Sequence, residues 1–461
     1  RQAPWMVDVP ARVGLGGMLR RESRCYSAST MKTLLAGFAI ALASIGAQAQ
    51  SPPPRPIVLH AAHMLDVAAG TLVSPGEVLV AGERIVAAGP HVDRPAGAEL
   101  IDLGDRTLLP GLIDAHVHLF LHPGAEDMQT IQESVPQRVI LAGIAARDDL
   151  MAGFTAERDM GTEGAGSAST AVRNAIDSGL IPGPRMRVSG NAIDLLGGHE
   201  DAIGYNPAAN VPSNADYANS AEDLVRVMRL QHKEGSDFAK IYETGPDTLK
   251  DGVLTTPYQY TEAELHAAVV EMARLTEGRV GAMGVGVHCT GEPAAGFAVA
   301  AGVASIDHAY FLSDRTMAEM KAKGIFAVPT FAIMEYFAAH AETPAAGERY
   351  KALLAFHAAQ FRRQLAAGVP FAVGSDVGPF PHGTQARELE LMVQYGMSPA
   401  DVLRADLLNG ARLLGWAGQI GELKPGLYAD IIAVEGNPLD DISALTHVAF
   451  VMKNGGINRR P

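Results

Sequence analysis

The central part of the chain alternates strand-like and helix-like segments, and this alternation limits the possible folds more than any other feature. Short runs of apolar and β-branched residues between turn residues are typical of buried strands. Eight such segments occur, at 109–118, 153–156, 185–189, 237–242, 284–288, 305–308, 325–329 and 371–376. Helical patterns separate several of them, so we predict an α/β fold in which residues 110–419 form a closed (β/α)8, or TIM, barrel.

Two of the predicted helices begin with clear capping signals. Thr261 precedes Glu264 by three residues, which is the spacing of a capping box, and apolar residues follow at helical intervals. Ser398 and Pro399 supply an N-cap residue and a first-turn proline before another helical pattern. We expect helices to start at both places.

The segments on either side of the predicted barrel are rich in strand-like runs. Residues 56–109 and 420–458 contain short apolar strands separated by Gly, Pro and Ser turns. Two β units this short cannot each bury a core alone. We therefore predict that they combine into one small β-sandwich domain built from both ends of the chain.

Residues 31–49 have the pattern of a secretory signal peptide. A basic start at 31–32 precedes an apolar run at 34–45, and an Ala-Gln-Ala cleavage site ends at Ala49. The apolar run is too short to span a bilayer as a helix. We expect cleavage after Ala49, no membrane anchoring afterwards, and a periplasmic or secreted location. Residues 1–30 show no structural pattern and are treated as an upstream extension.

The chain is acidic and contains only two cysteines. Its formal net charge of −14 argues against nucleic acid or an anionic membrane as a partner bound through the overall field. Cys25 lies in the upstream extension, so no disulfide can form within the mature chain. Cys289 directly follows His288 and points the other way in a strand, so we expect it to be an inert packing residue.

The first predicted strand ends in a His-x-His pattern. His116 and His118 project from the same face of the strand, because residues two apart in a strand point the same way. Two imidazoles side by side at a strand end provide half of a metal site. Taken alone, the pattern is equally compatible with two unrelated polar residues at a strand end.

Further polar residues stand at the ends of four other predicted strands. They are Lys240, His288, His308 and Asp376. In a parallel barrel the carboxyl ends of all strands open at one mouth, so these side chains and the His-x-His pair are expected to meet there. Four imidazoles, a lysine and a carboxylate at one mouth indicate metal-site chemistry.

With these residues the chain resembles the amidohydrolase superfamily over essentially all of its mature length. Within that superfamily it is similar to the imidazolonepropionase/prolidase-like branch, on the strength of Arg158-Asp159-Met160-Gly161, Gly197-Gly198-His199, Ala429-Asp430 and Asn437-Pro438-Leu439. Enzymes of similar character are metal-dependent carboxypeptidases and bacterial amidohydrolases that cleave ochratoxin A. The resemblance also implies a homo-oligomer.

The resemblance implies two divalent metal ions, most often zinc. His116, His118 and Asp376 would hold the more buried ion, His288 and His308 the other, and a carbamylated Lys240 would bridge them. A buried lysine can have a lowered pKa, and its free amine can take up CO2 to give an anionic oxygen ligand. Asp376 would also accept the proton of the attacking water and deliver it to the leaving amine.

The expected substrate is an amide whose leaving group is a C-terminal, often apolar, amino acid: a dipeptide, an N-acyl amino acid or a phenylalanine amide such as ochratoxin A. His199 and Tyr242 are candidate catalytic or substrate-binding residues, and His382 is a weaker candidate for the pocket. An apolar leaving group needs an apolar surface, for which four residues after the seventh strand are candidates: Phe331, Ile333, Met334 and Phe337.

Three other functions fit parts of the pattern. A deaminase of the same superfamily typically has a Glu three residues after the fifth-strand His, whereas Gly291 occupies that position and Glu292 follows it. A hydrolase of a cyclic amide, imidazolone or lactone would use the same ligands. A non-catalytic protein of this fold would be expected to lose ligands. Selectivity would depend on loops at 122–140, 199–220 and 243–260.

Overall fold

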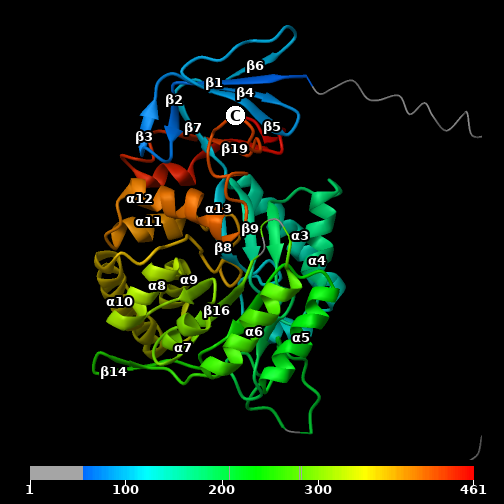
Figure 1. Cartoon of the computed structure of the whole chain (residues 1–461), viewed down its shortest axis with the longest axis vertical. Coiled ribbons are helices and arrows are strands. Elements are labelled where there is room, and N and C mark those ends of the chain that lie inside the picture. Colours follow the sequence, from blue (N-terminus) through cyan, green and yellow to red (C-terminus); the bar gives the residue numbers. More distant parts are fainter. Residues whose placement is uncertain (1–54, 207, 280, 282) are drawn as a thin grey trace, which may run out of the picture. The chain divides into compact units, whose positions relative to one another are not determined.

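The computed structural model describes residues 55–461, except for 207, 280 and 282 (Figure 1). The upstream extension and the signal peptide predicted for 1–49 lie outside the described residues. Within the described part of the chain, no helix combines the length and the apolar character needed to cross a membrane.

The strands near both ends of the chain form two sheets. The four-stranded sheet has the order β5 (Arg84–Gly89), β4 (Gly76–Ala81), β1 (Ile57–Ala61), β6 (Glu99–Asp102). The six-stranded sheet has the order β21 (Gly456–Arg459), β20 (Val448–Lys453), β19 (Ile431–Glu435), β7 (Arg106–Pro110), β2 (His63–Asp66), β3 (Thr71–Val73). Segments from opposite ends of the sequence are therefore hydrogen-bonded neighbours (Figure 1).

The pairing of β19 explains why neither terminal segment is complete alone. Ile431 lies opposite Pro110 on one side and opposite Met452 on the other, in antiparallel register. One hydrophobic cluster contains residues of both sheets, among them Leu59 and Phe450, whose side chains are fully buried. This shared cluster supports the prediction of a sandwich built from both ends.

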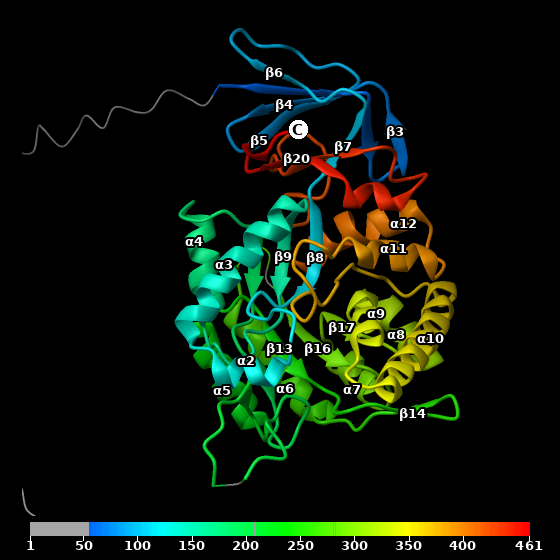
Figure 2. The same cartoon turned by 180° about the vertical axis from the view of Figure 1, so that it is seen from behind.

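Nine parallel strands form the central part of the fold. The sheet β10–β9–β8 contains Arg185–Val188, Phe154–Asp159 and Leu112–Val117. A second sheet has the order β12 (Ala215–Tyr217), β11 (Ala192–Asp194), β13 (Ala239–Tyr242), β16 (Val285–Cys289), β17 (Ser305–His308), β18 (Phe326–Val328). Figure 2 shows these strands from behind. The short strands β11 and β12 were not predicted from the sequence.

The predicted eighth strand is not a regular strand. Residues 371–377 form single parallel bridges instead, from Phe371 to Ala327 and from Val377 to Val117. Backbone hydrogen bonds from Ala115 and Asp376 add to these bridges. The segment thus lies between β18 and β8 and connects the two parallel sheets, which gives a TIM-barrel-type α/β fold.

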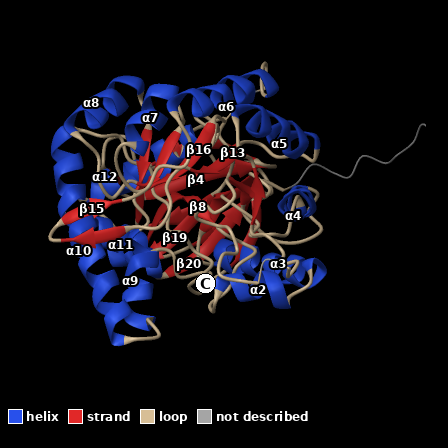
Figure 3. Cartoon of the chain, turned by 90° about the horizontal axis from the view of Figure 1, so that it is seen from below, coloured by secondary structure: helices blue, strands red, loops and turns tan. Residues whose placement is uncertain are grey.

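Helices surround the parallel strands (Figure 3). In chain order they are α2 (Glu126–Gln132), α3 (Val135–Met151), α4 (Ala168–Asp177), α5 (Ala221–Lys233), α6 (Glu262–Leu275), α7 (Ala294–Ala301), α8 (Asp314–Lys323), α9 (Phe331–His340), α10 (Pro344–Ala367), α11 (Arg387–Gln394), α12 (Pro399–Arg404) and α13 (Gly410–Leu413). A π-helical turn, η1 (Ala405–Asn409), joins α12 to α13, and a 3-10 turn, η2 (Ile442–Thr446), precedes β20.

Both capping predictions are confirmed. The Thr261 side chain accepts from the Glu264 backbone in a reciprocal capping box, and the Ser398 side chain accepts from the Asp401 backbone. The prediction of a loop at 122–140 is wrong, because α2 and the start of α3 lie in this segment. Of the other two loops, 243–260 contains the hairpin of β14 (Thr248–Lys250) and β15 (Val253–Thr255), and 199–220 contains β12.

The shared core of the two terminal sheets can be tested with Phe450→Ala. We expect this change to lower the free energy of unfolding by about 3–5 kcal/mol, because it leaves a cavity where a large aromatic ring is fully buried. Chemical denaturation with fluorescence or circular dichroism measures the effect. The matched control is Leu100→Ala on β6, where the side chain is half-exposed and the change should stay within about 0.5 kcal/mol.

Candidate functional site

One cavity of about 280 Å³ opens at the carboxyl ends of the parallel strands. All six predicted metal ligands line it, together with the two other predicted site residues: His116, His118, His199, Lys240, Tyr242, His288, His308 and Asp376. These residues come from β8, β13, β16, β17 and the segments that follow the strands. The structure therefore brings together side chains that are up to 260 residues apart in the chain.

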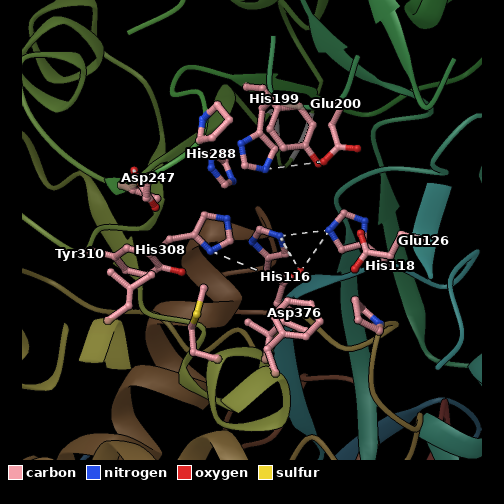
Figure 4. Close-up of a pocket in the computed structure, with 18 of the residues that line it drawn as sticks. His116, His118, Glu126, His199, Glu200, Asp247, His288, His308, Tyr310 and Asp376 are labelled. Carbon is pink, nitrogen blue, oxygen red and sulfur yellow. Dashed lines mark hydrogen bonds and ion pairs between the residues drawn. The ribbon is translucent and has the colours of Figure 1, made fainter. Parts of the chain in front are cut away.

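The His-x-His pair and Asp376 converge on one point (Figure 4). The Nε2 atoms of His116 and His118 are 3.3 Å apart. They lie 3.4 Å and 3.3 Å, respectively, from Oδ1 of Asp376. Donor atoms of His116, His308 and Asp376 all lie within 4.8 Å of one another. Two imidazole nitrogens and a carboxylate oxygen facing one point form a donor set that fits a divalent cation.

The two other imidazoles lie directly beside this group. The His288 and His308 rings are 4.3 Å apart, and the His308 ring is 5.1 Å from the His116 ring. Nε2 of His288 is buried and has no hydrogen-bond partner among the described residues. Burial, followed by the neighbouring His199 and His308, lowers the pKa of His288 well below its usual value. A neutral imidazole with an unused buried nitrogen fits a metal ligand.

The pKa values of the two histidines of the His-x-His pair are shifted in opposite directions. Burial and then the Lys240 charge lower the pKa of His116 to about 4. Burial also opposes a charge on His118, but the neighbouring Asp376 and Glu163 carboxylates outweigh it and raise its pKa well above the usual value. At neutral pH His116 is therefore uncharged, whereas the two carboxylates favour the positively charged form of His118.

Lys240 lies in a buried environment that disfavours the charged form of its amine. It belongs to β13 and is only 1% exposed. Burial lowers the pKa of its amine, although the Asp307 and Asp376 carboxylates oppose this shift. A lowered pKa increases the share of free amine, which is the form that can react with CO2.

Backbone strain is concentrated at the site. His308 and Asp376 both have left-handed conformations, with φ of 73° and 62°, and so does Thr330, at 54°. Such conformations cost about 1–3 kcal/mol each in residues other than glycine. Nδ1 of His308 lies 2.7 Å from the Thr330 hydroxyl, which fixes the orientation of the ring.

A close approach between β8 and the 371–377 segment places His116 against Asp376. At Gly374, a Cβ atom would lie 2.8 Å from the Cβ of His116 and 2.4 Å from a Val328 methyl group. Only glycine fits this position without displacing its neighbours. The Asp114 carboxylate accepts from the backbone N–H groups of His116 and Ser375, at 3.0 and 3.1 Å. The strand segments that carry the ligands are thereby fixed to each other.

His199 and Tyr242 form one side of the cavity next to His288. Their rings are stacked with centroids 5.1 Å apart, and the His199 ring is 4.2 Å from that of His288. Burial and then the Lys240 charge lower the pKa of His199 to about 4. Burial raises the pKa of Tyr242 well above its usual value, so the hydroxyl stays protonated and can donate. Ile333, Met334 and Phe337 also line the cavity, as predicted.

Two predictions about the cavity are wrong. His382 does not line it, because its Nδ1 lies 2.7 Å from the buried Asp149 carboxylate of α3, which holds the ring. Phe331 is buried in the core against His357 and Phe361, since it is the first residue of α9 and faces inward. Cys289 is fully buried in the main hydrophobic cluster, as expected for a packing residue.

Sequence reasoning missed several polar residues of the cavity: Glu126, Glu163, Glu200, Asp247, Tyr310 and Arg349. Most of them come from loops and helices after the strands, where no periodic pattern fixes the direction of a side chain. Tyr310 could have been predicted, because it follows His308 by two residues just as Tyr242 follows Lys240.

Comparison with known proteins gives consistent results. Residues 107–458 match the model of the amidohydrolase family. Ochratoxinase from Aspergillus niger is 29% identical over 383 residues, covering 77% of this chain and 76% of that protein. Its crystal structure has a TM-score of 0.74 at 25% identity, covering 88% of this chain and 96% of that one.

Two further relatives extend the comparison. The crystal structure of a Xaa-Pro dipeptidase with methionine bound in the active site has a TM-score of 0.77 at 29% identity, covering 87% of this chain and 99% of that one. Imidazolonepropionase from Geobacillus kaustophilus is 24% identical over 439 residues, covering 82% of this chain and 91% of that protein.

The donor set predicts that a divalent cation stabilises the protein. Saturating Zn²⁺ should raise Tm, and a chelator should lower it again, because a ligand at about 100 times its Kd contributes about 2.7 kcal/mol. His116→Ala should abolish most of the Zn²⁺ effect, whereas the control His266→Ala, at an exposed position of α6, should keep it. Equal Tm shifts in the two variants would contradict metal binding at this site.

Proposed function

Because the chain belongs to the amidohydrolase family, and is a hydrolase that acts on C–N bonds, we propose that it cleaves the amide bond to a C-terminal amino acid with two divalent metal ions. The observation that carries this proposal is the convergence of four imidazoles, Lys240 and Asp376 in one cavity. Members of the family generally bind divalent metals. Zinc suits the nitrogen-rich donor set best.

Each ligand has a proposed place. His116, His118 and Asp376 would hold the more buried ion, and His288 and His308 the other. Lys240, carbamylated by CO2, would supply an oxygen ligand to both. A pair of bound ions would lower the pKa of a water molecule and polarise the substrate carbonyl.

The protein's own residues would handle the proton and the substrate. The imidazoles of His116 and His118 hold the pKa of the Asp376 carboxylate below its usual range, despite burial. Asp376 is therefore ionised, and this is the form that would accept the proton of the attacking water and pass it to the leaving amine. The ring nitrogens of His199 and the hydroxyl of Tyr242 would orient the substrate through its carbonyl or its free carboxylate.

The cavity favours a substrate with an apolar leaving group. One side of the cavity is apolar and is formed by Ile333, Met334, Phe337 and Leu353. Arg349 is the one arginine among the described lining residues. The names of an ochratoxinase and a Xaa-Pro dipeptidase among the relatives support an amide of a free amino acid, such as a dipeptide, an N-acyl amino acid or an ochratoxin-like phenylalanine amide. Similarity to imidazolonepropionase keeps a cyclic amide or lactone as the second candidate.

We also propose that the chain is exported and acts as a homo-oligomer on small molecules. The export proposal is supported by the signal-like pattern at 31–49, and the assembly proposal by the family resemblance. Neither a nucleic acid nor a membrane is proposed as a partner, in line with the acidic composition.

Lys240→Ala tests the two-metal site. We expect this change to lower kcat by at least about 100-fold, because the bridging oxygen ligand is lost. Added acetate or formate should restore part of the activity by occupying the place of the carbamate. Lys453→Ala is the control, since it removes another largely buried lysine, with a pKa lowered to about 8, outside the cavity. Wild-type turnover in Lys240→Ala would contradict the proposed role.

Blocking the free carboxylate of the substrate tests which class of amide the enzyme cleaves. Esterifying or amidating it should lower kcat/KM by about ten- to a hundredfold, because a buried donor of the enzyme is left unpaired. His199→Ala or Tyr242→Phe should reduce this preference without changing the metal content. Tyr258→Phe, half-exposed and outside the cavity lining, is the control. Equal turnover of free and blocked substrates would favour the cyclic amide or lactone instead.

A further inference from the structure

Glu163 is a buried carboxylate that the proposed reaction does not use. It follows β9, is 2% exposed and has a left-handed backbone with φ of 45°. Its Oε1 lies 3.0 Å from Nδ1 of His118. Neither carboxylate oxygen has a hydrogen-bond partner among the described residues, so this contact is an ion pair. A strained and nearly inaccessible carboxylate beside an imidazole of the proposed metal site is well placed to act on that ring.

A buried arginine holds Glu163 in this place. The guanidinium of Arg138 on α3 is 1% exposed, and its Nη1 donates to the carbonyl of Glu163 at 2.5 Å. Its Nη2 donates at 3.0 Å to the carbonyls of Phe120 and Thr162. The planar guanidinium of Arg138 thus connects the loop after β8, just beyond the His-x-His pair, to the loop after β9. The strained backbone of Glu163 is fixed by these bonds.

We infer that Glu163 is the positioning residue of His118. Nδ1–H of His118 donates to the carbonyl of Gly161 at 3.3 Å, and the Glu163 carboxylate lies 3.0 Å from the same nitrogen as an ion-pair partner. Both contacts favour the proton on Nδ1, so the lone pair of Nε2 faces Asp376 and the centre of the cavity. The Gly161 carbonyl is neutral, so Glu163 is the anionic partner of the ring. A carboxylate behind a ligating imidazole fixes the tautomer and makes the ring a stronger ligand. This inference rests on the proposed function, because the group that Nε2 would bind is the metal.

The neighbouring histidine has a similar but looser arrangement. Nδ1 of His116 lies 3.7 Å from Oδ1 of Asp307, and Nη2 of Arg158 donates to that same oxygen at 2.8 Å. At 3.7 Å the imidazole and the carboxylate are not hydrogen-bonded. Each ring of the His-x-His pair therefore has a carboxylate and a buried arginine behind it, but the carboxylate of Glu163 lies closer to its ring, at 3.0 Å against 3.7 Å. We expect the larger effect on metal binding at Glu163.

The experiment compares zinc affinity between variants by competition with a chromophoric chelator. Glu163→Ala should weaken zinc binding by about 10–100-fold, because His118 loses its anionic partner. Glu163→Gln keeps the shape and a polar oxygen beside Nδ1 but removes the negative charge, so it should lose less. If Glu163 had a purely structural role, its replacement would lower the Tm of the metal-free protein. The alanine and glutamine variants would then bind zinc with the same affinity.

The chain offers a matched control in Glu133. Its Oε1 lies 2.8 Å from Nε2 of His122, so Glu133→Gln changes a second Glu–His pair outside the cavity lining. Zinc affinity should stay at the wild-type value in this variant. Wild-type affinity in Glu163→Ala, or an equal loss in Glu133→Gln, would overturn the inference. If the alanine variant does not fold, wild-type affinity in Glu163→Gln overturns it.

Failure of the proposed function would look different from failure of this inference. A wild-type protein that takes up no zinc would contradict the metal-dependent function itself. A wild-type protein that binds zinc normally, together with an unaffected Glu163→Ala, would contradict only the role of Glu163.

Discussion

The site depends on the hydrogen bonds between the first parallel strand and the segment that returns beside it. The backbone N–H of Asp376 donates to the carbonyl of His116, and that of His118 donates to the carbonyl of Val377, both at 2.8 Å. These two bonds join parts of the chain that are 260 residues apart in sequence, and they set the distance between the His-x-His pair and Asp376. Gly374 permits the approach, because a side chain there would meet His116. The strained φ of Asp376 is the local cost of this arrangement.

Much of the fold could be predicted from the sequence because its periodic signals are strong. The capping box at Thr261 and the N-cap at Ser398 start helices as expected. The segment 371–377 lacks regular pairing, although its apolar run predicts a strand. The segment is held by single β-bridges and by a hydrogen bond to the side chain of Asp114. A strand pattern in the sequence does not predict contacts of this kind. The loop prediction at 122–140 failed because polar residues such as Glu126 and Gln129 belong to a short helix, where Gln129 is buried and Glu126 lines the cavity.

The candidate ligands could be predicted for a similar reason, and their surroundings could not. Strand ends fix where Lys240, His288 and His308 point, and all three line the cavity. Glu163 lies in a loop whose backbone is held by the side chain of Arg138 on α3. His382 was misplaced because the sequence does not show that Asp149 takes up its ring. Residues placed by the backbone of a strand are thus predictable, whereas residues placed by side-chain hydrogen bonds are not.

Burial of so many ionisable groups has a consequence for stability. His116, His288 and Lys240 all have pKa values lowered by desolvation, while Asp376 stays charged through its imidazole neighbours. Without a cation, their donor atoms crowd together in a space that water solvates poorly, which disfavours the folded state. A bound cation would replace this crowding with ligand bonds, so its binding free energy adds directly to the stability of the fold. The folded chain and the occupied site would therefore stabilise each other, and the strained residues around the site could persist because that coupling offsets their cost.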